Sequence, residues 1–209
     1  MKSIYILGAG GFAKEVYGLI LDIGEFKIEA FIDKDGFKDI TMGRTNVPVI
    51  SEMDFLAKEL PNETCLAIGV GDSKLINLLV ENFKNYNFPN LIHPKAHINL
   101  AYCSLGSGNI ITVGVVFTSN ITVGSYNVFN LNTTIGHDVV IGNCNIFNPS
   151  VNISGGVIIE SQNLFGVGST VLQNLRVGNN NIIGASTLIH RNMVINNSTI
   201  VGIPGKIIK

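Results

Sequence analysis

The sequence predicts a protein of two parts, a small parallel α/β domain followed by a triangular parallel β-helix. Strand-like and helix-like segments alternate through the first ninety or so residues, a pattern typical of a parallel sheet covered by helices. After them, a large apolar residue recurs at every sixth position from Leu105 to Val201. Asparagine also recurs at every eighteenth position from Asn109 to Asn181, which gives the length of a full turn.

The first strand, helix and second strand follow one another closely. A buried strand over residues 3–7 leads through a glycine-rich turn into a helix over residues 12–23, which Gly24 ends. A second strand over residues 27–32 places Asp33 at its carboxyl end.

Two further helices and one strand complete the domain. A helix is expected over residues 51–60, where Ser51 and Asp54 form a capping-box-like arrangement. A third strand over residues 64–70 is followed by a helix that starts at residue 72 or 73 and ends near residue 83.

The six-residue repeat continues through the rest of the chain without an insertion. A period of six is neither helical nor strand-like, so each repeat corresponds to a whole structural unit, and three faces per eighteen residues predict a triangular coil. We expect every repeat position to point into the coil and the asparagines to form a ladder of hydrogen bonds. Residues 87–95 form the junction, and the coil begins near residues 98–105. The repeat positions are Leu105, Ile111, Phe117, Val123, Phe129, Ile135, Ile141, Phe147, Ile153, Ile159, Phe165, Val171, Val177, Ile183, Ile189, Ile195 and Val201.

Composition and charge exclude several classes of function. The formal net charge of −1 gives no electrostatic argument for binding nucleic acid or an anionic membrane. No apolar run approaches the roughly 18–20 residues that a membrane span needs. Three cysteines lack the spacing of metal ligands, which favours reduced, buried thiols in a cytoplasmic protein.

The glycine-rich turn is a candidate phosphate-binding loop. Residues 8–13 read GAGGFA, which fits G-x-G-x-x-[GA] between a strand and a helix, and Asp33 ends the next strand. In dinucleotide-binding domains such glycines allow close approach of a phosphate, and the acid binds a ribose hydroxyl. About ninety residues suffice for one mononucleotide unit and not for the two that hold NAD, which favours a nucleotide-bearing ligand over a redox cofactor. The alternative is a tight turn that binds nothing.

Within the repeat, His137 is the candidate catalytic residue. It is the third residue of the six that begin at Ile135, a place that points outward, and Asp138 follows it. Eighteen residues on, Gly155 leaves the space beside the imidazole unfilled. A histidine next to an acid and to a residue without a side chain is a reasonable general base. The alternative is an exposed histidine without a role.

Two sets of motifs carry a family resemblance. Apolar-glycine pairs such as Ile135-Gly136 and Ile141-Gly142 resemble the hexapeptide repeat of left-handed β-helix acyltransferases. The left-handed sense of the coil comes from this resemblance, since parallel crossovers are ordinarily right-handed. Nearly the whole chain, in both halves and in order, resembles the bacterial NeuD/PglD-type sugar acetyltransferases. The motifs that carry this resemblance are residues 8–13, 31–33 (FID), 67–69 (AIG), 91–94 (LIHP) and 136–138 (GHD).

The resemblance implies an activity and a set of site residues. Members of the family transfer an acetyl group from acetyl-CoA to a nucleotide-linked amino-dideoxy sugar or to a sialic acid. By this resemblance His137 is the catalytic base with Asp138 beside it, Asn130 and Gly155 lie near the acetyl group, and the protein is a homotrimer with active sites between neighbouring coils. The nucleotide sugar is expected at Gly10, Gly11, Phe12, Asp33 and Gly69.

Two features of the repeat fit coenzyme A independently. Gly166, Gly184 and Gly202 share one column at eighteen-residue spacing and predict a shallow groove along the axis. All basic residues of the repeat lie towards its end, where we expect them to bind the phosphates of acetyl-CoA. The alternative is that the glycines are only corner residues and the basic tail is only soluble. We add Gly166, Gly184, Ala185 and Lys206 to the expected acetyl-CoA site. Many family members carry a second histidine where this chain has Ile146, so any contact from that side chain is lost.

The sequence therefore predicts an acetyl-CoA-dependent N-acetyltransferase acting on a nucleotide-linked amino-dideoxy sugar in the synthesis of a surface glycan (O-antigen, capsule or glycoprotein). Residues 1–92 form the Rossmann-like nucleotide-sugar domain, and residues 93–209 form the left-handed β-helix that binds acetyl-CoA. Two alternatives stay open: O-acetylation of a sialic acid or related sugar, and a non-catalytic nucleotide-sugar-binding solenoid. A zinc carbonic anhydrase, also built on a left-handed β-helix, is rejected because it needs three histidines at one metal and the repeat has two. No metal is predicted.

Overall fold

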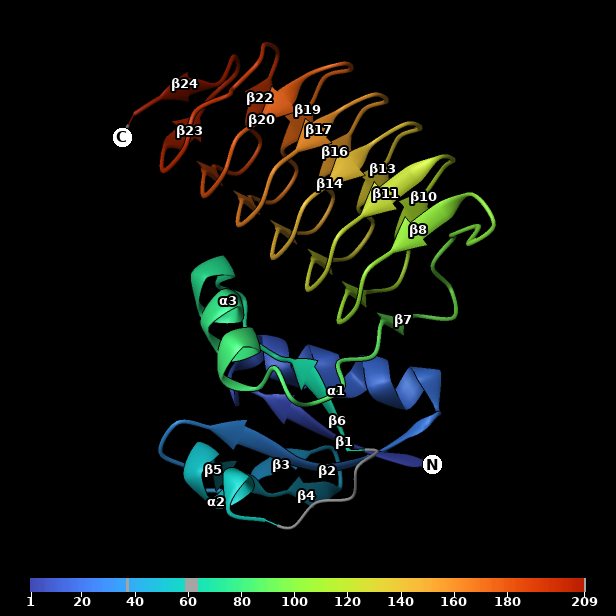
Figure 1. Ribbon diagram of the computed structural model, residues 1–209, viewed down its shortest axis with the longest axis vertical. Coiled ribbons are helices and arrows are strands. Elements are labelled where there is room, and N and C mark those ends of the chain that lie inside the picture. The colour runs from blue at the N-terminus through green and yellow to red at the C-terminus, as the bar shows by residue number, and fades with distance from the viewer. Residues whose placement is uncertain (37, 59–63, 209) are drawn as a thin grey trace.

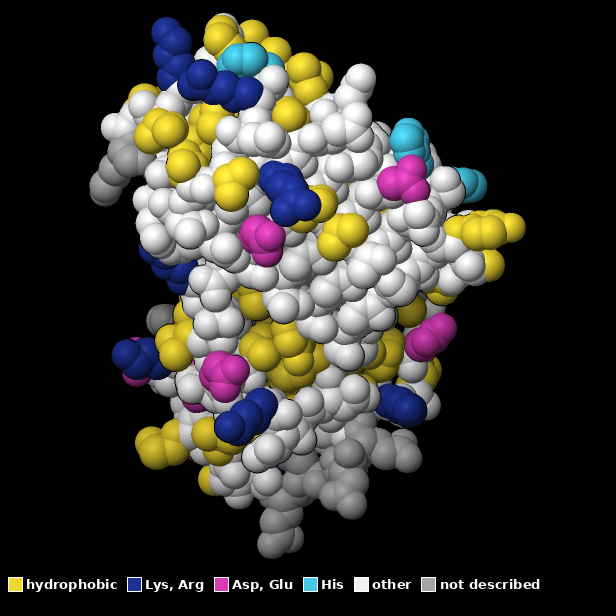
Figure 2. All heavy atoms as spheres, turned by 45° about the horizontal axis from the view of Figure 1, so that its top comes forward, with side chains coloured by type: hydrophobic (Ala, Val, Ile, Leu, Met, Phe, Trp, Pro, Cys, Tyr) yellow, Lys and Arg dark blue, Asp and Glu magenta, His cyan; other side chains and the backbone are white. Residues whose placement is uncertain are grey.

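The computed structural model describes residues 1–36, 38–58 and 64–208, and it has the two predicted parts. Figure 1 shows the α/β domain lying against one side of an elongated coil, whose axis runs from the domain junction to the C-terminus. No helix in these ranges has the length and apolar character that crossing a bilayer requires. On the face drawn in Figure 2, charged side chains are few over the coil.

The α/β domain contains the predicted alternation and adds three short strands. Its four-stranded parallel sheet has the order β5-β2-β1-β6, which places the first strand of the chain in its interior. The hairpin of β3 and β4 and the strand β5 were not predicted, because each has only three residues. The elements are β1 (Lys2–Leu7), α1 (Gly11–Ile23), β2 (Phe26–Asp33), β3 (Ile40–Met42), β4 (Thr45–Val47), β5 (Val49–Ser51), α2 (Glu52–Leu56), β6 (Cys65–Ile68) and α3 (Ser73–Asn82).

The helix caps agree with the sequence, whereas one helix is shorter than expected. Ser51 is the N-cap of α2 and accepts a hydrogen bond from the backbone N–H of Asp54, and Asp72 caps α3 in the same way. α2 ends at Leu56 with Ala57 as its C-cap, so the prediction of a helix to residue 60 is wrong at residues 57 and 58. Residues 59 and 60 of that prediction lie outside the described residues.

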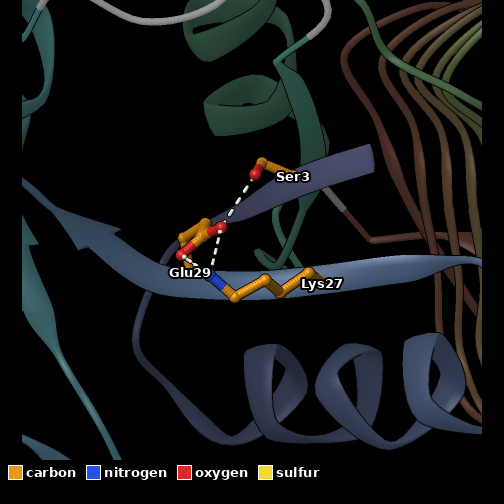
Figure 3. Close-up of polar contacts among 3 residues, drawn as sticks. All are labelled: Ser3, Lys27 and Glu29. Atoms are coloured by element: carbon orange, nitrogen blue, oxygen red, sulfur yellow. Dashed lines mark hydrogen bonds and ion pairs between the residues drawn. The ribbon is translucent and has the colours of Figure 1, made fainter. Parts of the chain in front are cut away.

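Glu29 links the two central strands on the side of the sheet drawn in Figure 3. The Ser3 hydroxyl on β1 donates to Glu29 Oε1 at 2.7 Å, and Lys27 Nζ lies 3.0 Å from the same oxygen. The hydrogen bond from Ser3 and then that from Lys27 hold the pKa of the Glu29 carboxyl below its ordinary value. This contact therefore favours the ionised carboxylate in the folded state.

The coil is a triangular prism with three parallel sheets, which we call faces 1, 2 and 3. Face 1 contains β7 (Leu91–Ile92), β9 (Ile110–Ile111), β12 (Val128–Phe129), β15 (Ile146–Phe147), β18 (Leu164–Phe165), β21 (Ile182–Ile183), β23 (Thr199–Val201) and the antiparallel β24 (Lys206–Ile207). Face 2 contains β10 (Val116–Phe117), β13 (Thr134–Ile135), β16 (Asn152–Ile153), β19 (Thr170–Val171) and β22 (Leu188–Ile189). Face 3 contains β8 (Cys103–Leu105), β11 (Ile121–Val123), β14 (Val140–Ile141), β17 (Ile158–Ile159) and β20 (Arg176–Val177).

The predicted register holds through the middle of the coil. Every repeat position from Ile111 to Ile189 is buried in one apolar core. The rings of Phe129, Phe147 and Phe165 stack on one another with centroids 4.8 and 4.9 Å apart, which is the spacing of neighbouring strands in a sheet. The six-residue repeat is thus confirmed as one face of a coil with eighteen residues per turn.

The asparagine ladder is also confirmed, and it has one more member than the sequence predicted. The backbone N–H and Nδ2 of Asn127 donate to Oδ1 of Asn109 at 2.9 and 3.1 Å, and the backbone N–H donates in the same way at each step up to Asn181. Asn109 in turn donates to Oδ1 of Asn90. Each amide therefore satisfies buried backbone polar groups at one edge of the coil.

Both ends of the coil depart from the strict period of six. Leu91 pairs with Ile110, nineteen residues on, so the first coil holds one extra residue and begins at Leu91 rather than near residues 98–105. In the last coil Ile200 pairs with Ile183 after only seventeen residues. Because of this shortening, Ile200 is the buried residue and Val201 is not, so the prediction that Val201 points inward is wrong. Counting by six cannot detect a changed coil length.

The α/β domain covers face 1. The outward side chains of that face, including Ile110, Val128 and Ile146, belong to the same apolar cluster as the core of the α/β domain. His93 adds a polar link, since its Nε2 lies 3.2 Å from Asp22 Oδ2 on α1 while its Nδ1 accepts from the backbone N–H of Lys95. Val128 is thus buried between the coil and the chain's own α/β domain.

Candidate active site

His137 and Asp138 lie together on the prism edge between faces 2 and 3. They follow β13 on face 2 and precede β14 on face 3. Asp138 has a φ of +59°, a left-handed conformation that aspartate tolerates better than most residues. Both side chains are open to solvent, with exposed fractions of 68% for His137 and 54% for Asp138. The edge therefore presents the pair to any ligand that lies along it.

The aspartate fixes the chemistry of the imidazole. Asp138 Oδ2 lies 2.7 Å from Nδ1 of His137. A carboxylate at this distance accepts the Nδ1–H, which leaves Nε2 of the neutral ring as a proton acceptor. Hydrogen bonds from Asn120 and then His137 hold the pKa of the Asp138 carboxyl below its ordinary value, so it is ionised at neutral pH. The pair has the arrangement of a general base and the group that orients it.

Gly155 lies directly against the imidazole in the next coil. A Cβ at this position would lie 2.6 Å from both Cε1 and Nε2 of His137 and 3.0 Å from Cδ2. The expectation that the space beside the ring is unfilled is therefore corrected, because the ring itself occupies it. Only glycine at residue 155 leaves room for this orientation of the imidazole.

Sequence reasoning missed Asn120, the third polar member of this cluster. It lies on the same edge one coil earlier, and its Nδ2 donates to Asp138 Oδ1 at 2.5 Å. The signal was available, because residue 120 precedes residue 138 by one full turn of eighteen residues.

At the carboxyl edge of the α/β sheet, the structure brings Asp33 and the glycine loop together. Asp33 lines two adjoining cavities, one of about 420 Å³ with Gly8 and one of about 350 Å³ with Ala9 and Gly10. Ligands of open parallel sheets bind at this edge. Phe12, another residue expected to bind the nucleotide sugar, is half-buried and packs against the core of the α/β domain.

Close packing requires glycine at some positions around this edge but not at others. Gly8 has a φ of +104°, and a Cβ there would lie 2.7 Å from Val70 Cγ1. A Cβ on Gly69 would lie 2.6 Å from Ile6, so packing alone requires glycine at residue 69. A Cβ on Gly10 or Gly11 would meet nothing within 4 Å, and neither residue has a positive φ. The fold itself therefore does not require glycine at residues 10 and 11.

The residues expected to bind acetyl-CoA lie mostly on another edge, between faces 1 and 2. Asn130, Gly166 and Gly184 form one column there, because they follow β12, β18 and β21 on face 1. Asn130 is buried, and its Oδ1 accepts from the N–H of Leu131. Ala185 and Lys206 are exposed near the end of the coil.

The glycine column is explained by the stacking of the coils. A Cβ on Gly166 would lie 2.5 Å from the backbone nitrogen of Ala185, and one on Gly184 would lie 2.8 Å from Val201. Gly202 does not continue the column, because the shortened last coil places Val201 beside Gly184. The groove inferred from three glycines is therefore corrected to two glycines that allow close contact between turns.

One face of the prism separates the two expected parts of the coil site. Asn130 lies at the edge before β13 and His137 at the edge after it, so the single chain does not bring them together. The edge that carries His137 is also the one opposite face 1, which the α/β domain covers. Since a face is one strand and a corner wide, the prism separates His137 from the α/β domain of the same chain by roughly 15 Å.

The position of the second family histidine has a clear structural role in this chain. Ile146 is buried on face 1 between Val128 and Leu164 and contributes to the joint core with the α/β domain. In the described part of the chain, no three His, Cys, Asp or Glu side chains gather where they could share a metal ion.

Comparisons with known proteins agree with this architecture. Residues 3–83 match the family model of the PglD N-terminal domain. A mutant perosamine N-acetyltransferase from Caulobacter crescentus, solved with CoA and GDP-perosamine, is 25% identical, with a TM-score of 0.90 over 100% of this chain and 98% of that one. WeeI from Acinetobacter baumannii AYE is 25% identical, with a TM-score of 0.88 over 100% of both chains. The acetyltransferase domain of PglB from Neisseria gonorrhoeae FA1090 shares the fold, with 24% identity and a TM-score of 0.90 over 100% of both chains. No curated protein matches the sequence.

The triangular coil with the α/β domain on its first face is the architecture of the solved left-handed β-helix acetyltransferases. The family model over the α/β domain and the solved structures that align with the whole chain narrow this class. The α/β domain matches the PglD N-terminal domain, and the chain as a whole is similar to the Caulobacter perosamine N-acetyltransferase and to WeeI.

Proposed function

We propose that the protein transfers the acetyl group of acetyl-CoA to the amine of a nucleotide-linked amino-dideoxy sugar, a step in the synthesis of a surface glycan such as lipopolysaccharide. The observation that carries the proposal is the pair on the free edge of the coil. Asp138 engages Nδ1 of His137 at 2.7 Å, and Nε2 remains as the acceptor for a proton. GDP-perosamine bound to the Caulobacter enzyme supports an amino sugar as the acceptor, rather than a hydroxyl of sialic acid or a non-catalytic solenoid.

The proposed chemistry is direct acyl transfer. The sugar amine attacks the carbonyl carbon of the thioester, so that a C–N bond forms and the C–S bond to coenzyme A breaks. His137 Nε2 takes the proton that the amine loses, and the thiolate of coenzyme A recovers a proton as it leaves. Such proton transfer contributes typically 10²–10⁴-fold to the rate. We assign stabilisation of the negative charge on the thioester oxygen to a backbone N–H near Gly155.

We place the nucleotide of the acceptor at the carboxyl edge of the α/β sheet. Gly10 and Gly11 leave open space above the N-terminus of α1, and Gly10, the N-cap residue, makes no side-chain cap. The free N–H groups at such a helix start attract phosphate oxygens, and the missing side chains allow close approach. Asp33 lines the adjoining cavities and is assigned to hydroxyl or base N–H groups of the nucleotide.

We propose a homotrimer, and the positions of the two halves of the site support a site shared between copies. A sugar held by the α/β domain on face 1 cannot reach His137 of the same chain, because the prism lies between them. In the proposed assembly, the α/β domain on face 1 of a neighbouring copy and the edge that carries Asn130 of that copy lie next to His137. The edge between faces 1 and 2 carries exposed apolar side chains in one column, with exposed fractions of 38% at Val113, 39% at Leu131 and 52% at Val167. Such a stripe is suited to contact between copies.

The division of labour follows the two parts of the chain. We assign residues 1–92 to the nucleotide sugar and residues 93–209 to acetyl-CoA and catalysis, although β7 at Leu91–Ile92 already pairs with β9 of the coil. Gly155 and Asn130 are assigned to the acetyl group, and Gly166, Gly184, Ala185 and Lys206 to the remainder of acetyl-CoA. Cys103 and Cys144 are buried thiols, which suits a cytoplasmic enzyme with cytoplasmic substrates.

The test is turnover of acetyl-CoA by the purified protein. Release of the free thiol is followed with a panel of nucleotide-linked 4-amino-4,6-dideoxy sugars and with sialic acid as the hydroxyl acceptor. The protein should consume acetyl-CoA with an amino sugar and produce the N-acetyl product. His137→Ala should lower kcat by a hundredfold or more and leave acetyl-CoA affinity within a few-fold, because only proton transfer is lost. Near-normal turnover by this variant would remove the assignment of the base.

A further inference from the structure

Asn120 belongs to the same edge of the coil as the catalytic pair and has the same backbone conformation as the aspartate. Asn120 has a φ of +55° and Asp138 a φ of +59°, and the two residues occupy equivalent corners of consecutive coils. Their side chains therefore leave the edge side by side. The amide reaches the carboxylate without any displacement of the backbone.

The two oxygens of Asp138 have separate partners. Oδ1 accepts from Asn120 Nδ2 at 2.5 Å, and Oδ2 faces His137 Nδ1 at 2.7 Å. The terminal torsion of an aspartate side chain is broad and roughly two-fold, so an exposed carboxylate held at one oxygen only can rotate. A second donor removes that freedom. Asp138 is 54% exposed, which means that neighbouring packing does not hold it.

Three consecutive coils thus define the position of one imidazole. The first coil supplies Asn120, the second supplies His137 and Asp138, and the third supplies Gly155, whose Cα side lies against the ring. Asp138 is the charged group that contacts the ring through a hydrogen bond in the described structure. Orientation of the base therefore depends on the carboxylate, and orientation of the carboxylate depends on the amide.

We propose that Asn120 is a positioning residue for the general base. It fixes the Asp138 carboxylate so that the His137 ring keeps its proton on Nδ1 and presents Nε2 to the acceptor amine. This inference rests on the proposed function of His137. The hydrogen bond that the other ring nitrogen makes decides which tautomer a neutral histidine adopts, so loss of the amide donor should change both the tautomer and the rate.

A purely structural role for Asn120 has a matched control within the chain. Asn180 has a φ of +56° at a different edge, and its Nδ2 also donates to a side-chain oxygen in the next coil, that of Asn197. It is therefore equivalent to Asn120 in conformation and hydrogen bonding, but its partner is not a catalytic group. Glycine is the replacement to use at both positions, because it adopts positive φ without strain.

The experiment compares Asn120→Gly with Asn180→Gly in the full-length protein. For Asn120→Gly we expect kcat about tenfold lower, with both Michaelis constants within about twofold, as for the loss of one hydrogen bond to a charged group. ¹⁵N NMR of the neutral His137 ring should show the proton on Nδ1 in the parent and a mixture with the Nε2–H tautomer in the variant. Asn180→Gly should leave kcat and tautomer unchanged while it lowers the melting temperature by a similar amount.

Two results would overturn the proposal. One is an Asn120→Gly variant with the parent's tautomer and kcat. The other is an equal loss of kcat in Asn180→Gly, which would make the effect one of coil stability. Failure of the proposed function is distinguishable from both, because it appears as turnover that survives His137→Ala, whereas the tautomer measurement reports the hydrogen bonds whether or not the ring is the base.

Discussion

Replacement of Gly155 by alanine should displace the imidazole of His137 without unfolding the coil. The new Cβ would lie 2.6 Å from Cε1 and Nε2 and 3.0 Å from Cδ2 of the ring. Carbon atoms in contact are about 3.5–4.0 Å apart, so the ring must retreat by about 1 Å. Gly155 does not have a positive φ, and alanine is therefore compatible with its backbone.

The expected result is a loss of rate with little loss of stability. A misplacement of about 1 Å costs on the order of 10²-fold in rate, equivalent to about 2.7 kcal/mol of transition-state stabilisation. The assay is kcat for thiol release from acetyl-CoA, measured together with the free energy of unfolding in urea. Gly18→Ala is the matched control, because a Cβ there meets nothing within 4 Å inside helix α1. It should leave kcat unchanged and raise stability by about 0.5–1 kcal/mol.

A double variant separates this clash from other effects of the alanine. Once His137 is replaced by alanine, the ring that the new methyl group meets is absent, so Gly155→Ala should add no further loss of rate. Interaction energies of residues in contact are commonly 0.5–3 kcal/mol. A Gly155→Ala variant with kcat within threefold of the parent, or losses that multiply in the double variant, would refute the geometry of the site.

Three further predictions test the substrate site, the assembly and the pH dependence of stability. Asp33→Ala should raise the Michaelis constant for the nucleotide sugar about tenfold and leave that for acetyl-CoA nearly unchanged, since the proposed site places only the nucleotide of the sugar at Asp33. Initial rates against each substrate measure this, and the opposite pattern would count against the site. Val167→Glu should convert the proposed trimer into 22.5 kDa monomers in light scattering, with activity lost and circular dichroism retained, because it introduces charge into the exposed apolar column. The pKa of Glu29 is lowered in the folded state, so its hydrogen bonds contribute about 1 kcal/mol to the free energy of unfolding above the pKa of the unfolded state. This contribution is lost as the pH falls through the pKa of the folded state. The free energy of unfolding in urea should therefore differ less between pH 6 and pH 3 in Ser3→Ala than in the parent.

The sequence predicted the coil more completely than the α/β domain. Inward positions and ladder asparagines recur at fixed intervals, so each coil repeats the same local energetic requirement, the burial of an apolar side chain and the pairing of an amide. A three-residue strand such as β5 has no such repetition and depends on its neighbour β2 for pairing. Its position therefore could not be predicted from local pattern.

The candidate site was predicted only in part, even where its residues share one column of the coil. His137 and Gly155 are separated by one turn of the coil, and their contact follows from the period. Asn120 lies one turn before Asp138 and was within reach of the same reasoning. By contrast, the distance between His137 and Asn130 depends on the width of a face of the prism. The spacing of the repeat along the sequence does not give this width.

The sequence by itself determined the triangular coil, the parallel α/β domain and the residues that meet across successive turns, because a constant period relates each residue to the one eighteen positions away. Only the tertiary structure decided which face the α/β domain covers, because that depends on how a non-repeating surface fits the outward side chains of Ile110, Val128 and Ile146. That choice leaves His137 on the opposite edge. It is also the reason why we propose a site shared between copies, since the core of the prism separates His137 from the α/β domain of its own chain.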